Sequence, residues 1–142
     1  MSDGKNEIEQ LLHAYVTAVY AKDVSAYMAL YDEHVRIFDM WEKWACEGAG
    51  EWRKSAEGWF NSLGAERVVV EADEINIHVA DSLATLDGFV KFTAQSAEGA
   101  EMRSLTSRLT WVLKSVNHQW KIVHQHTSAP VAFEGAKAIF NR

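Results

Sequence analysis

Apolar positions near the start of the chain recur at helical spacing. The longest stripe predicts an amphipathic helix; it contains Ile8, Leu11, Leu12, Tyr15, Val16 and Val19. Asn6 and Glu9 have the spacing of a capping box at the start of this helix. A second, shorter stripe follows Asp23, a residue type that suits an N-cap; it contains Val24, Tyr27, Met28 and Tyr31. Because only Ala21 and Lys22 separate the stripes, we predict a helical hairpin.

The pattern then changes from helix to strand, with one further helix between. Val35–Phe38 reads as a strand. A third helix is predicted by a stripe that contains Trp52, Ala56, Trp59, Phe60 and Leu63. Gly64 stands where a left-handed residue commonly closes a helix. After it come four β-rich stretches, roughly residues 67–80, 83–96, 103–116 and 120–128. The polar breaks between them are short, so consecutive strands are expected to pair as antiparallel hairpins.

This order of elements predicts an α+β fold. Three helices precede a meander of long strands, so the helices are expected to cover one face of an antiparallel sheet. A strongly curved sheet that closes over helices leaves a cavity at its open end. The expected architecture is a curved sheet packed on three N-terminal helices and enclosing a pocket.

Composition narrows the classes of protein that remain. A chain of 142 residues has room for one core, so we expect a single domain over residues 1–142. No apolar run approaches the roughly 20 residues that span a bilayer, and Met1–Glu7 is polar, unlike a secretory signal, so a cytoplasmic location is expected. A net charge of −6 without a basic patch argues against nucleic acid and anionic membrane as partners. Cys46 is the only cysteine, which excludes an internal disulfide.

Two segments carry a resemblance to a known family. Residues 15–19, 29–32 and 35–39 resemble the first helix through the first strand of ketosteroid isomerases. The terminal segment 120–128, with Trp120, Val123, His124, His126 and Ser128 at fixed spacing, resembles SnoaL-like domains and the association domain of calcium/calmodulin-dependent protein kinase II. All belong to the nuclear transport factor 2-like superfamily, and the resemblance covers nearly the whole chain. It implies a cone-shaped sheet around a pocket, and this superfamily contains enzymes, binding proteins and assembly modules.

Asp39 and Tyr15 are the candidate catalytic residues. If the face of Val35 and Ile37 lines an apolar cavity, burial raises the pKa of the Asp39 carboxyl and makes it a better proton acceptor near neutral pH. The resemblance to the isomerases implies that Asp39 abstracts a proton beside a carbonyl while Tyr15 donates a hydrogen bond to the enolate. The plainer alternative is that Asp39 caps a turn and Tyr15 is ordinary core.

The isomerase pattern is incomplete, because that mechanism uses a second, protonated carboxylic acid on a later strand. Residues 102–119 contain no Asp or Glu, which argues against steroid isomerisation. The same stretch contains Arg108, which in a pocket beside Asp39 would favour an anionic ligand through a forked contact. The alternatives are that Arg108 forms a structural ion pair or faces water.

His124, His126, Trp41 and Trp59 complete the candidate ligand-binding set. The two histidines stand two apart on a strand and are expected to share a face, at the inner wall or mouth of the cavity. No third ligand has a recognised spacing to them, so neither a metal nor another cofactor is expected. The tryptophans would supply apolar surface to a ligand, although Trp59 also fits the core stripe of its helix.

Two classes of function therefore stay open. The first is a small-molecule-binding domain, for a small anionic or carbonyl-bearing ligand, or an oligomerisation module without catalysis. The second is an isomerase, lyase or cyclase with Asp39 as general base, in which Tyr15 and Arg108 stabilise negative charge. In either case we expect a homodimer, because apolar residues on the outer face of the long strands exceed what three helices can cover.

Overall fold

The computed structural model describes residues 4–142, so the first three residues of the polar N-terminal segment lie outside it. The described chain contains, in order, α1 Gly4–Ala21, α2 Val24–Met28, β1 Tyr31–Phe38, β2 Cys46–Glu47, α3 Ala49–Ser62, β3 Arg67–Ala80, β4 Leu83–Gln95, β5 Glu101–Val116 and β6 Gln119–Ser128. The fold is α+β, as the sequence predicts. Within residues 4–142 no helix is long and apolar enough to cross a membrane.

The strands form one open sheet in the order β2-β1-β6-β5-β4-β3. The four long strands pair as consecutive antiparallel hairpins, as predicted. The expectation of a wholly antiparallel sheet is wrong at β1, which pairs parallel with β6, with Phe38 opposite His126. The sheet is therefore mixed. A parallel pair needs a long connection, and β2, α3 and the other three long strands lie between β1 and β6 in the chain.

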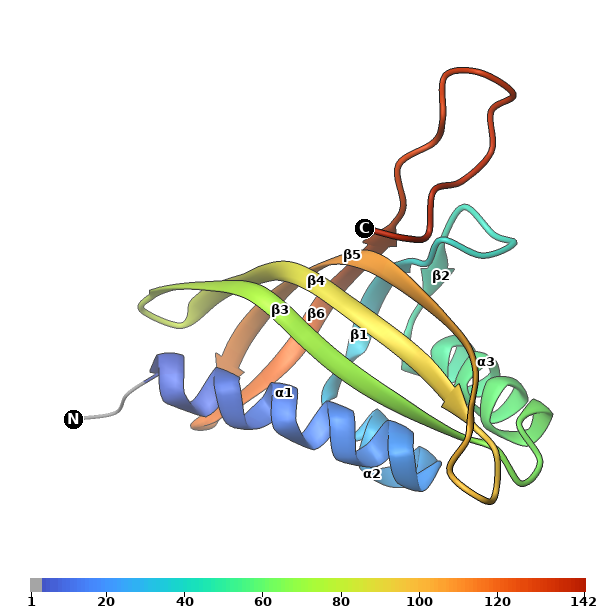
Figure 1. Cartoon of the computed structure of the whole chain (residues 1–142). Coiled ribbons are helices and arrows are strands. Elements are labelled where there is room, and N and C mark those ends of the chain that lie inside the picture. Colours follow the sequence, from blue (N-terminus) through green and yellow to red (C-terminus); the bar gives the residue numbers. More distant parts are fainter. Residues whose placement is uncertain (1–3) are drawn as a thin grey trace.

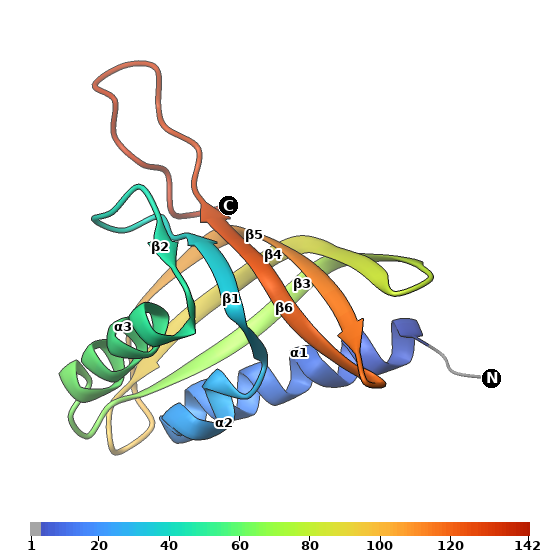
Figure 2. The same ribbon diagram turned by 180° about the vertical axis from the view of Figure 1, so that it is seen from behind.

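The helices lie on the concave side of this sheet (Figures 1 and 2). The apolar stripe of α1 faces the sheet, and Ile8, Leu11, Tyr15 and Val19 are all buried. The sheet curls over α1, while α3 lies across the other end beside β1 and β2 (Figure 2). Ser107 of β5 and Gln125 of β6 are buried on this concave side.

Helix ends agree with the sequence in part. The Asp23 side chain accepts a hydrogen bond from the backbone N–H of Ala26, which confirms it as the N-cap of α2. Gly64 has φ of +57° just after α3, as expected of a left-handed closing residue. The capping box is wrong, because α1 already begins at Gly4 and Asn6 lies inside the helix. Tyr31 belongs to β1 rather than to α2, which ends at Met28.

A β-bulge in β3 bends the sheet. The pairing of β3 with β4 shifts between Asp73 and Asn76, and Glu74 there has φ of +51°. Gly88 on β4 lies against the bulge, where a Cβ atom would stand 2.4 Å from Ile75 Cδ1. Ile75 can turn away, but the same Cβ atom would also stand 3.0 Å from the carbonyl oxygen of Asp73 and 3.1 Å from that of Glu74. A side chain at this position would therefore press on the backbone of the bulge.

The C-terminal segment, residues 129–142, projects beside the loop between β1 and β2 and then returns to the sheet (Figure 1). An isolated bridge joins Val131 and Ala138. Past the end of β6, the carbonyl oxygen of Phe140 accepts a hydrogen bond from the N–H of Thr106 on β5, at 2.8 Å. This contact places the Phe140 side chain over the end of the concave face.

Candidate functional site

The concave face holds a cavity of about 550 Å³. Its walls come from α1, α2, α3, the inner faces of β3 to β6, the loop after β1 and the C-terminal segment. Most of the lining side chains are apolar or aromatic; those used below are Tyr15, Tyr27, Asp39, Trp41, Trp52, Trp59, Phe92, Arg103, Ser107, Gln125, Thr127 and Phe140. The site is thus an apolar hollow with a few polar groups, the usual composition of a small-molecule pocket.

Asp39 lies in this wall, directly after β1. The hydroxyl of Thr127 on β6 donates to Asp39 Oδ1 at 3.0 Å, and the N–H of Met40 donates to Thr127 Oγ1 at 3.1 Å. Burial raises the pKa of the Asp39 carboxyl, while the hydrogen bonds from Thr127 and the Met40 backbone oppose the shift. The carboxyl is consequently held in one orientation and is a better base than an exposed aspartate.

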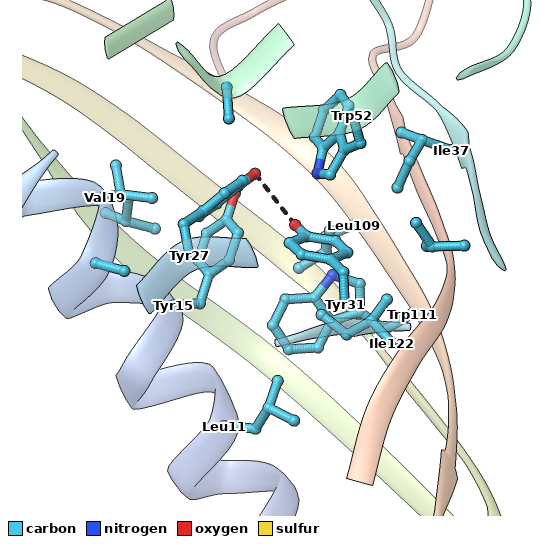
Figure 3. Close-up of a cluster of buried hydrophobic side chains, with 14 of the residues drawn as sticks. Leu11, Tyr15, Val19, Tyr27, Tyr31, Ile37, Trp52, Leu109, Trp111 and Ile122 are labelled. Carbon is cyan, nitrogen blue, oxygen red and sulfur yellow. Dashed lines mark hydrogen bonds between the residues drawn. The ribbon is translucent and has the colours of Figure 1, made fainter. Parts of the chain in front are cut away.

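A tyrosine cluster forms the inner end of the site. The hydroxyl groups of Tyr31 and Tyr27 are 3.1 Å apart (Figure 3). Tyr31 also donates to Gln125 Oε1, at 2.6 Å. Trp111 Nε1 donates to the same Gln125 oxygen at 2.9 Å. Tyr15 packs against Tyr27 with ring centroids 5.4 Å apart. Gln125 therefore fixes the position of the Tyr31 hydroxyl, and Tyr15 and Tyr27 line the cavity.

All three hydroxyls of the cluster stay neutral. Burial, the largest cause, raises the pKa of Tyr15, Tyr27 and Tyr31 well above the ordinary tyrosine value. Repulsion by the charge of Asp39 adds to the shift in each case. Neutral phenols can donate hydrogen bonds, so Tyr15 and Tyr27 can stabilise negative charge that develops on a ligand oxygen.

Aromatic side chains close the remaining sides. Trp59 on α3 lies edge-on to Phe92 of β4, with ring centroids 6.2 Å apart. Trp41, in the loop after β1, is half exposed and contacts Phe140 at a centroid separation of 5.6 Å. The predicted tryptophans Trp41 and Trp59 thus both line the cavity. Phe140 was not predicted, because nothing in the sequence shows that the C-terminal segment returns to β5.

Arg108 does not belong to this site, so the prediction that it shares the cavity with Asp39 is wrong. Its side chain is exposed, and Arg108 Nε donates to Ser128 Oγ at 2.9 Å. Its neighbours Ser107 and Leu109 are buried on the inner face, and alternation along β5 directs Arg108 to the outer face. Arg103 lines the rim instead, where it forms a forked ion pair with Glu66 at 2.9 and 3.2 Å.

The two histidines also lie outside the cavity. They share one face of β6, as predicted, but it is the outer face; their ring centroids are 6.3 Å apart, and Phe38 contacts both. His124 Nδ1 lies 2.7 Å from the carbonyl oxygen of Arg36. His126 lines a second, more open hollow that also contains Asp39 and Trp41. The expectation that His124 lines the pocket is wrong, and His126 reaches only this neighbouring hollow.

Two further polar groups in the cavity were not singled out from the sequence. Trp52 on α3 and Ser107 on β5 are both buried, and neither Trp52 Nε1 nor Ser107 Oγ has a hydrogen-bond partner in the described chain. Cys46 is buried and burial raises the pKa of its thiol, which makes it a poor nucleophile. Among residues 4–142 no three His, Cys, Asp or Glu side chains are grouped to hold a metal ion.

Comparison with known proteins identifies the type of domain. Residues 8–132 match the family model of the SnoaL-like domain. No curated protein matches the chain. Among solved structures, a nuclear transport factor 2-like protein of unknown function from Pseudomonas putida is 24% identical, with a TM-score of 0.85 over 98% of this chain and 95% of that one.

Two other solved structures have the same fold. A candidate calcium/calmodulin-dependent protein kinase II association domain from Xanthomonas campestris is 15% identical, with a TM-score of 0.76 over 92% of this chain and 89% of that one. A nuclear transport factor 2-like superfamily protein from Salmonella enterica is 20% identical, with a TM-score of 0.73 over 95% and 96%. At these identities the likeness establishes the fold alone.

Proposed function

This chain belongs to the SnoaL-like domain family, and from that premise and the geometry of the cavity we propose that it binds a small, neutral, carbonyl-bearing organic molecule on its concave face. The observation that carries the proposal is an apolar hollow of about 550 Å³ with convergent polar groups. Pockets of roughly 300–1,000 Å³ suit small organic ligands. The rings of Trp59, Phe92 and Phe140 supply apolar contact area, which favours a planar or cyclic body.

The charges of the site favour a neutral ligand over an anion. The sequence alone left both open, and the anionic alternative depended on Arg108, which faces outward. Arg103 at the rim is already paired with Glu66 by a forked contact. An anion in the cavity would therefore meet the Asp39 carboxyl without an available guanidinium, and like charges at close range disfavour binding.

The binding proposal is tested with matched aromatic probes. We expect α-tetralone to raise the unfolding midpoint of the purified protein in a concentration-dependent way, and the anion α-naphthoate to have a much smaller effect. Ala56 is buried in the cavity wall on α3, so Ala56→Phe should fill the cavity and abolish the shift. Asn61→Phe introduces the same ring on an exposed position of α3 and serves as the control. Binding that survives Ala56→Phe would contradict the proposed location.

A second candidate function is proton transfer beside the ligand's carbonyl. It is favoured by one observation: a carboxyl with a raised pKa and two neutral phenols line the same cavity. Asp39 would take a proton from the carbon next to the carbonyl, the C–H electron pair would form the enolate, and Tyr15 would donate a hydrogen bond to its oxygen. Return of the proton to the same or a conjugated carbon completes an exchange or isomerisation.

Exchange in heavy water separates the two candidates. If the protein is an enzyme of this kind, NMR should show deuterium entering α-tetralone beside its carbonyl faster with protein than in buffer. Asp39→Asn should abolish the acceleration while retaining binding, and Tyr15→Phe should slow it about 10²-fold, the usual cost of one oxyanion donor. Binding without accelerated exchange would leave a ligand-binding domain and refute catalysis on this probe.

A further inference from the structure

Two residues that line the cavity each carry a buried polar atom without a hydrogen-bond partner in the described chain. Trp52 is 7% exposed and Ser107 is 2% exposed, and both line the cavity. Neither Trp52 Nε1 nor Ser107 Oγ has a partner among residues 4–142. Buried polar groups are nearly always hydrogen-bonded, since leaving one unpaired is unfavourable. Two such groups on one cavity indicate that the site is built for a polar occupant.

Trp52 approaches the site from α3. Its indole nitrogen lies on the side of the ring that faces the hydroxyls of Tyr27 and Tyr31 (Figure 3). The indole N–H is close enough to Tyr31 to oppose the rise in that tyrosine's pKa, but it does not reach hydrogen-bond geometry. Tyr31 donates its one hydroxyl proton to Gln125, and its oxygen lies outside hydrogen-bond geometry with the indole N–H. An indole N–H can only donate, so the missing partner must be an acceptor.

Ser107 belongs to another element of the cavity lining, the inner face of β5. Leu109, two residues along the same face, is paired with Thr127, whose hydroxyl holds Asp39. Ser107 therefore lies one step along the inner face from the Thr127–Asp39 contact. Its hydroxyl can donate as well as accept. A ligand group bound by Ser107 would consequently lie near the candidate base.

We propose that Trp52 Nε1 and Ser107 Oγ form a polar subsite that binds an uncharged oxygen acceptor of the ligand. This rests on the proposed ligand-binding function and adds to it: the occupant carries a carbonyl or comparable oxygen at this end, and its apolar body lies along Trp59 and Phe92. The two residues select for the oxygen, because a ligand without it leaves both groups unpaired. Asp39 remains available for an acidic C–H or O–H of the same ligand.

Stability of the ligand-free protein gives the first test. Removing a buried hydroxyl that has no partner is neutral or stabilising, whereas removing a bonded one is destabilising. Ser107→Ala should therefore leave the unfolding midpoint unchanged or raise it. Ser115→Ala, on the same strand and outside the cavity lining, is the control and should have little effect. A Ser107→Ala midpoint several degrees below both the wild type and the control would show that the hydroxyl already has a partner and would overturn the subsite.

Affinity for a matched pair of probes gives the second test. Alpha-tetralone and tetralin share a bicyclic skeleton and differ in the carbonyl oxygen. In calorimetric titration the wild type should bind α-tetralone about tenfold more tightly, a factor that corresponds to about 1.4 kcal/mol. Ser107→Ala and Trp52→Phe should each reduce this preference while leaving the affinity for tetralin less changed. Because Trp52→Phe also removes core volume, Ser107→Ala carries the decision.

The outcomes separate this inference from the function on which it rests. Wild-type protein that binds neither probe would refute the proposed binding function. Equal affinity for both probes, or a preference for α-tetralone that Ser107→Ala leaves intact, would refute the subsite while leaving the binding function standing. A preference lost in Ser107→Ala and kept in Ser115→Ala supports it.

Discussion

Gln125 links the core to the cavity, and its replacement tests how the tyrosine cluster is held. Gln125 is 2% exposed, and its Oε1 accepts from Tyr31 at 2.6 Å and from Trp111 at 2.9 Å. Trp111 can only donate, which determines that the amide oxygen, and not the nitrogen, faces this pair. Gln125→Met keeps the approximate volume of the side chain and removes the acceptor.

The expected loss follows from the two donors. A buried donor without a partner costs about 1–3 kcal/mol. The Tyr31 hydroxyl can turn toward Tyr27, 3.1 Å away, so Trp111 alone is left fully unpaired. We therefore expect Gln125→Met to lower the free energy of unfolding by about 1–3 kcal/mol, the range for one unpaired buried donor. For a chain of this size that corresponds to a fall in the unfolding midpoint of about 3–12 °C.

Urea and thermal unfolding, followed by circular dichroism at one protein concentration, measure this loss. Gln119→Met replaces an exposed glutamine on the same strand and should change stability by less than about 0.5 kcal/mol. Tyr31→Phe combined with Gln125→Met should cost less than the sum of the single changes, because the two residues share one hydrogen bond. A loss below about 1 kcal/mol for Gln125→Met, less than one unpaired buried donor, would refute the reasoning.

Three further predictions concern charge, curvature and assembly. The raised pKa of Asp39 means that the folded state holds the proton more tightly than the unfolded state. Stability should therefore fall as pH rises from the ordinary carboxyl pKa to the raised one, and Asp39→Asn should remove this fall. If the wild type and Asp39→Asn have parallel pH profiles in urea unfolding, the prediction is contradicted. Gly88→Ala should cost about 1–3 kcal/mol by overpacking against the backbone oxygens of Asp73 and Glu74 in the bulge, whereas Gly58→Ala, with open space around it, should not destabilise. We also propose a homodimer, because large apolar side chains such as Trp44 are exposed; light scattering should give twice 16.0 kDa, and a concentration-independent monomer would contradict it.

The local spacing of apolar and polar residues predicts most of the helices and strands. The stretch predicted at residues 67–80 coincides with β3, and the stripe of α1 has the predicted apolar face. Tyr31 was assigned to the second helix because its spacing from Tyr27 is helical, yet it begins β1. Its place is set by tertiary pairing with Ile122 on β6, across most of the chain. Such long-range pairings leave no periodic signal, so the parallel contact of β1 and β6 could not be predicted from spacing.

Of the candidate site residues, the ones on helices and in the loop after β1 line the cavity as predicted. The prediction was wrong for Arg108 and the histidines, whose positions depend on the direction of side chains along a strand. On β5 the signal was available: Leu109, Trp111 and Leu113 alternate as the apolar face, which places Arg108 outside. On β6 it was not. The register shifts where Val112 pairs with His124 and Leu113 with Ile122. Before the irregularity the buried residue is Ile122, and after it the buried residues are Gln125 and Thr127. His124 and His126 therefore point to the outer face.

The protonation states around the cavity restrict what its occupant can be. Tyr15 and Tyr27 stay neutral and donate, Trp52 only donates, and Asp39 is the one carboxyl in the described lining. A complementary ligand is therefore rich in acceptors and presents a single donor or acidic C–H toward Asp39. Binding and proton transfer then make different demands on the same oxygen. If Trp52 holds the oxygen in both the ground state and the transition state, Trp52→Phe should weaken binding more than it slows exchange. If Tyr15 donates to the oxygen only as negative charge develops on it, Tyr15→Phe should slow exchange more than it weakens binding.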